Sequence, residues 1–133
     1  MHTTLTLAQA QAIIEGALAR SKSEKFKPMA VAVLDAAGHL KAFAREDGAS
    51  MFRFEVAQAK AWGAVGMGAS SRTLAQRAKD NPNFFVSLSA TASGKFLPQT
   101  GAVLIHSNTG EILGAVGASG GMTGPVRRWC CHL

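Results

Sequence analysis

Charged side chains crowd into a short stretch near the middle of the chain. Arg45, Asp47, Arg53 and Glu55 fall within eleven residues, and Lys60 follows shortly after them. The stretch coincides with a predicted junction of a strand, a loop and a helix, where opposite charges can form a rim above a polar pocket. The alternative is that these residues form only surface ion pairs, each of which contributes about 0–1 kcal/mol to folding stability.

Glu55 and Lys60 are the candidates for proton transfer in this stretch. Both fall on a predicted helix, and a spacing of five residues turns their side chains about 140° apart. They therefore do not form a facing pair. Two classes of function stay open: a ligand-binding module, and an enzyme acting on a small oxidised acid, aldehyde or other catabolic metabolite. An assembly protein is a third.

Two of the four histidines lie beside predicted turns. His39 and His106 are in positions where a histidine is ordinarily solvated. A neutral imidazole there can also be an axial ligand of haem iron or cobalt. The cysteines, Cys130 and Cys131, are adjacent and lack the spaced ligand pairs of a zinc site, so the sequence indicates neither a disulfide nor a metal cage.

The composition fits one small domain with an apolar core. The chain has 133 residues, 47% of them hydrophobic, and a formal net charge of +6. No nucleic-acid partner is expected, because there is no tyrosine and no basic run interleaved with aromatic residues. No apolar run approaches the roughly 20 residues of a membrane span, and no secretion signal is visible. We therefore expect no membrane partner and a cytoplasmic location.

Hydrophobic periodicity predicts two hairpins separated by helices. A capping box at Thr6–Gln9 begins a helix that runs to about Ser21. The expected strands span residues 29–34, 40–44, 101–106 and 112–118. Because tight turns join them, neighbouring strands must be antiparallel, and the fold class is α+β.

Two helices are expected between the hairpins. The first begins after Gly48, and the second is capped by Ser70 or Ser71 and stops before Pro82. Residues 83–94 show no clear period and are expected to form a loop over the core. The glycine-rich segment 63–71 is either a closely packed helix end or an anion-binding turn.

Three segments together resemble the GlcG/HbpS family of small haem-binding proteins. They read "MAVAVLDAAGHLKAFAREDGA", "FEVAQAKAWGAVGMG" and "GAVLIHSNTGEILGAVGASG". That family also includes the C-terminal domain of PduO-type corrinoid adenosyltransferases. The resemblance implies a profilin-like layered domain with an antiparallel sheet packed by helices, assembled into dimers or larger rings. It implies haem or a related tetrapyrrole as the ligand, with cobalamin as the less favoured cofactor.

The family pattern also implies a set of binding residues. The ligand-binding candidates are His39, Arg45, Asp47, Lys60 and Ser119. Of these, His39 is the candidate ligand of a haem iron. A carboxylate or propionate of the ligand would meet Arg45 in a bidentate contact. Alternatively, Arg45 is structural and buried against Asp47 or Glu55. Where the family usually reads R-M-D-G, this chain has Arg45-Glu46-Asp47-Gly48. Glu46 puts a charge where the methionine thioether would pack.

The last thirteen residues depart from the family pattern. Residues 1–120 form the GlcG/HbpS-like domain, and residues 121–133 form an atypical tail in place of the family's C-terminal helix. The tail contains the basic, cysteine-containing sequence "MTGPVRRWCCHL". One hypothesis for it is a reading-frame change near Gly121.

Overall fold

The computed structural model describes residues 4–120 and has eight regular elements. They are α1 (Leu7–Ser23), β1 (Met29–Asp35), β2 (Leu40–Arg45), α2 (Phe52–Met67), α3 (Ser71–Asp80), α4 (Pro82–Thr91), β3 (Ala102–His106) and β4 (Ile112–Gly120). The predicted α+β class is confirmed. The tail at residues 121–133, with its cysteines, lies outside the described residues.

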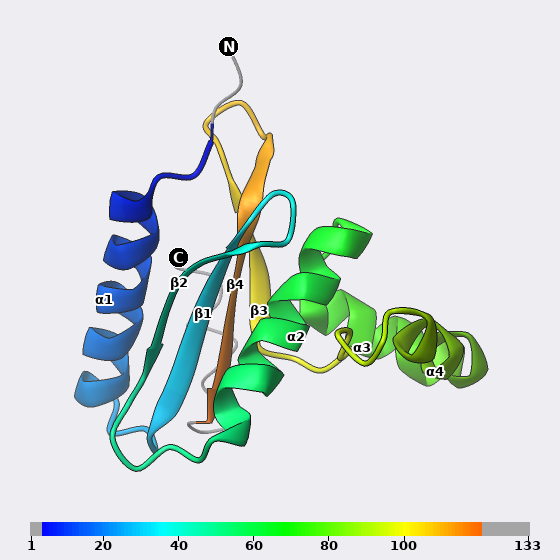
Figure 1. The fold of residues 1–133 in the computed structure, drawn as a ribbon, viewed down its shortest axis with the longest axis horizontal. Coiled ribbons are helices and arrows are strands. Elements are labelled where there is room, and N and C mark those ends of the chain that lie inside the picture. Colours follow the sequence, from blue (N-terminus) through cyan, green and yellow to red (C-terminus); the bar gives the residue numbers. More distant parts are fainter. Residues whose placement is uncertain (1–3, 121–133) are drawn as a thin grey trace.

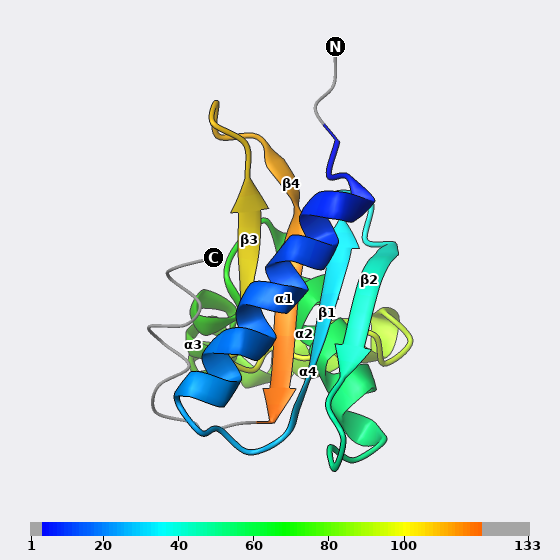
Figure 2. The same ribbon diagram turned by 90° about the vertical axis from the view of Figure 1, so that its left-hand side faces the viewer.

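The four strands form one antiparallel sheet in the order β2-β1-β4-β3. Helix α1 covers one face of the sheet and α2 the other, while α3 and α4 extend away beside α2 (Figures 1 and 2). Both hairpin turns lie at one end of the sheet. The start of β1, the end of β4 and the first turn of α2 lie at the opposite end.

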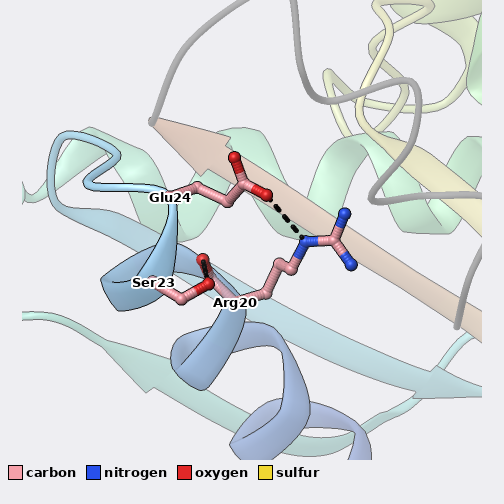
Figure 3. Close-up of polar contacts among 3 residues, drawn as sticks. All are labelled: Arg20, Ser23 and Glu24. Atoms are coloured by element: carbon pink, nitrogen blue, oxygen red, sulfur yellow. Dashed lines mark hydrogen bonds and ion pairs between the residues drawn. The ribbon is translucent and has the colours of Figure 1, made fainter.

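Helix α1 begins at the predicted capping box. The Thr6 hydroxyl accepts a hydrogen bond from the Gln9 amide, and the Gln9 side chain accepts one from the Thr6 amide. At the other end, the Ser23 hydroxyl donates to the Arg20 carbonyl, and Arg20 Nε lies 3.4 Å from Glu24 Oε1 (Figure 3). This last pair is partly exposed, and such pairs contribute little to stability.

Helix α2 packs on the sheet through small residues. Ala57, Ala61 and Ala64 are fully buried on its inner side. A Cβ atom built at Gly117 of β4 would lie 2.2 Å from the Ala57 carbonyl oxygen. No side chain fits in that space, so glycine at this position allows the helix backbone to approach the strand directly.

The prediction of a loop over residues 83–94 is wrong in its first part, because α4 occupies Pro82–Thr91. Pro82 ends the pattern of α3 and at the same time takes the first position of α4, where its missing N–H costs nothing. Phe85 is 5% exposed and belongs to a cluster with Leu74 and Phe96. Contact with this cluster, rather than a local helical stripe, stabilises the helix.

Candidate functional site

The strand register places Arg45 and Ser119 in one row across the sheet. Arg45 of β2 pairs with Ala30 of β1, and Ala30 pairs with Ser119 of β4. Residues paired in this way share a face, and here it is the face covered by α2. Two strand spacings separate the Cα atoms of Arg45 and Ser119 by about 10 Å. Only the methyl group of Ala30 stands between them in the row.

Helix α2 adds two basic side chains above the same end of the sheet. Arg53 and Lys60 are seven residues apart, which places them on one side of the helix. Arg53 Nη1 donates to Ser119 Oγ at 3.4 Å, and Lys60 Nζ donates to the Ala118 carbonyl at 3.3 Å. Both distances are long for hydrogen bonds. We call Arg45, Arg53, Lys60 and Ser119 the cationic end of the sheet.

The two arginines of the cationic end have no direct carboxylate partner among residues 4–120. Arg45 donates to the carbonyl of Ala49, and not to Asp47 or Glu55, which are both exposed. Neither Arg45 nor Arg53 lies within 4.0 Å of a described acidic oxygen. Their guanidinium groups therefore keep donors available for a bound anion.

Glu46 points away from the cationic end. Its Oε1 accepts from the Met29 amide at 3.0 Å and from the Ser21 hydroxyl at 3.3 Å. The carboxylate thus joins the loop after β2 to the start of β1 and to α1. The charge that replaces the family's methionine has a structural partner here, and it does not project over the face that α2 covers.

Aromatic side chains flank the cationic end. Phe43 lies two residues before Arg45, on the same face of β2, and its ring packs edge-on against Phe54 with centroids 4.5 Å apart. Phe43 remains 39% exposed, while Met51 and Phe52 at the start of α2 are 72% and 61% exposed. We call these four residues the apolar flank. The sequence pattern did not indicate that Phe43 and Arg45 share a face with Phe54 packed against it.

His39 lies at the opposite end of β2 from Arg45. Its exposed side chain follows a turn in which Asp35 Oδ1 accepts from the amides of Ala37 and His39. The rise of a strand places His39 and Arg45 about 20 Å apart. The structure does not bring the two candidates into one compact site, so a ligand touching both would have to lie lengthwise along β2.

The second histidine candidate lies on the edge strand opposite β2. His106 ends β3, three strand spacings or about 14 Å from β2, so it does not face His39. Trp62 of α2 lies near the His39 turn, since a Cβ built at Gly38 would be 3.3 Å from the indole Nε1. Within residues 4–120 no three His, Cys, Asp or Glu side chains gather as a metal site.

The glycine-rich segment serves as a helix junction. Gly68 ends α2 in the left-handed conformation at φ 66°, and the Ser70 hydroxyl accepts from the Thr73 amide to cap α3. Of the three glycines in this segment, only Gly63 is closely packed, since a Cβ built there would lie 2.6 Å from the Phe96 ring. None of the helices within residues 4–120 is both long and apolar enough to cross a bilayer.

The four-stranded antiparallel sheet lies between α1 and α2, and this arrangement defines a small layered α+β domain. The model of the family described as "Haem degrading protein HbpS-like" matches residues 5–126. The chain belongs to this HbpS-like family.

Solved structures have the same fold. The structure described as a PduOC:heme complex is 22% identical, with a TM-score of 0.84 over 97% of this chain and 91% of that one. Klebsiella pneumoniae protein ORFY is 20% identical, with a TM-score of 0.85 over 98% and 89%. A double mutant of Streptomyces reticuli HbpS is 25% identical, with a TM-score of 0.76 over 90% and 77%. A search of curated protein sequences found no match.

Proposed function

We propose that this protein binds haem or a related tetrapyrrole, seated against β2 and the first turn of α2. The observation that carries the proposal is the apolar flank beside two arginines that have no described carboxylate partner. Membership of the HbpS-like family supports it, as does the shared fold with a structure described as a haem complex.

The chemistry of a haem matches both parts of this surface. Its flat macrocycle is apolar and gains about 25 cal/mol for each Å² removed from water by side chains such as Phe43 and Phe52. Its propionates are carboxylates, which arginine binds through two parallel hydrogen bonds. The bound group would supply redox-active iron, while Arg45 would orient it and the aromatic rings would exclude water.

His39 remains the predicted iron ligand in this proposal. In a haem lying along β2, His39 would hold the iron, Arg45 would bind a propionate, and Phe43 would pack against the ring. We also expect a homo-oligomer, as the family resemblance implies, which light scattering after size exclusion tests directly.

A haemin titration followed by absorbance tests the proposal. We expect a saturating Soret shift at a fixed ratio, its loss in His39→Ala, and no change in His106→Ala. Arg45→Gln should weaken binding about tenfold or more, because a charge-assisted hydrogen bond is lost. Arg77→Gln removes one exposed positive charge from α3, outside the proposed site, and is the control. A weak, non-saturating change that is equal in all five proteins would overturn the proposal.

A further inference from the structure

We infer that Arg53 and Ser119 form the centre of a carboxylate-binding subsite at the cationic end. The shared chemistry is a carboxylate, which can come from a free small organic acid or from a haem propionate. The haem arm of this inference rests on the proposed function, and the small-acid arm does not.

The hydroxyl of Ser119 is the first observation. The residue is 1% exposed, and its oxygen accepts from Arg53. A serine hydroxyl also has one proton to donate, and the Ser119 proton meets no acceptor among residues 4–120. A buried donor without an acceptor is costly, and an incoming oxyanion beside Arg53 would satisfy it.

The guanidinium of Arg53 is the second observation. It makes one long contact of 3.4 Å to a neutral oxygen, although a guanidinium carries five N–H donors in a planar fork. The side chain is exposed, so a ligand can reach it from solvent. Its remaining donors suit the two oxygens of a planar carboxylate.

The surrounding backbone and charges favour an anion at the same place. Helix α2 begins next to this site, and its N-cap residue Met51 makes no side-chain capping bond. In the first turn the Arg53 amide donates to the Ser50 carbonyl. The amides of Phe52 and Phe54 make no such bond within residues 4–120. These groups carry a partial positive charge.

Lys60 Nζ donates to the carbonyl of Ala118, the residue before Ser119. Its ammonium group adds a further positive charge near the subsite.

The small-acid arm can be tested by amide NMR with sodium succinate, at ionic strength held constant with sodium chloride. We expect saturable shifts at the amides of Arg53, Ser119 and Gly120. The shifts should be lost in Arg53→Gln and reduced in Ser119→Ala. Arg77→Gln removes one exposed charge from α3 and should keep them. Equal, non-saturating shifts in all four proteins would overturn this arm.

The haem arm compares haemin with haemin dimethyl ester, which lacks free carboxylates. We expect the wild type to bind haemin about tenfold or more tightly than the ester, and Arg53→Gln to lose most of that preference. If haemin binds but Arg53→Gln keeps the full preference and succinate does not bind, the inference fails and the proposed function stands. If succinate binds through Arg53 and Ser119 while haemin does not bind, the proposed function fails and the subsite stands.

Discussion

Arg53, in the first turn of α2, donates a hydrogen bond to the buried hydroxyl of Ser119, 66 residues later at the end of β4. The contact joins the two elements that meet at the cationic end. Strand β1 lies between β2 and β4, and its residue Ala30 pairs with both Arg45 and Ser119. Arg45 therefore lies in the same row as Ser119, two strand spacings away. The candidate site thus depends on the whole sheet and not on one loop.

Glu46 should be required for stability and not for ligand binding. Glu46→Ala removes the acceptor of the Met29 amide and the Ser21 hydroxyl, and an unpaired, partly buried donor costs about 1–3 kcal/mol. Urea unfolding measures the loss, and haemin affinity of the folded variant should be unchanged. The neighbouring Asp47→Ala, an exposed residue, should leave stability within about 0.5 kcal/mol of wild type. A stability equal to wild type for Glu46→Ala would contradict this role.

Gly117 should not tolerate a side chain. Gly117→Ala places a methyl group 2.2 Å from the Ala57 carbonyl oxygen and 3.1 Å from the Ala61 methyl. Separating α2 from β4 should lower the free energy of unfolding by about 1–3 kcal/mol or more. In α2, a Cβ built at Gly66 meets no atom within 4 Å. Gly66→Ala should therefore leave the free energy of unfolding unchanged or raise it by up to about 1 kcal/mol. Chemical denaturation of both variants checks the contrast.

Ser71 should protect the edge of β3. Its fully buried hydroxyl accepts from the Ala102 amide at 2.7 Å and donates to the Ala102 carbonyl at 3.2 Å. Ser71→Ala leaves both backbone groups without this partner, at a cost of about 1–3 kcal/mol. Faster hydrogen exchange at the Ala102 amide would accompany the loss. Ser87→Ala, on the exposed side of α4, serves as the control and should change neither quantity.

The capping box of α1 should contribute measurably to stability. Thr6→Ala removes one of the two reciprocal bonds with Gln9, and such a change typically costs about 1 kcal/mol. Thr4→Ala, two residues earlier and exposed, should have no effect. Thermal unfolding followed by circular dichroism distinguishes the two. Equal melting temperatures for the two variants would contradict the expectation.

Local signals were sufficient to predict most elements. Capping at Thr6, the turn opened by Asp35 and the change of period after Gly48 depend on a few neighbouring residues, and the corresponding elements lie within three residues of their expected bounds. Helix α4 was missed because Pro82 was interpreted only as a stop signal. The partners that stabilise this helix, Leu74 and Phe96, lie outside it.

The candidate site could be predicted only in part. The resemblance indicated Arg45 and Ser119, but their position in one row follows from the pairing of β1 with β4, which no local pattern encodes. The role of Arg53 depends on that same non-local pairing. The separation of His39 from Arg45 is a simple result of strand length, once the bounds of β2 are known.

Because Trp62 packs against Gly38, its fluorescence can report how far a bound haem lies from the His39 turn. The chain has two tryptophans, so a Trp129→Phe variant emits from Trp62 alone. A bound haem accepts energy from an excited indole with steep distance dependence. Trp62 emission would therefore be quenched most strongly by a haem near the His39 turn, and less by one confined to the far end of β2.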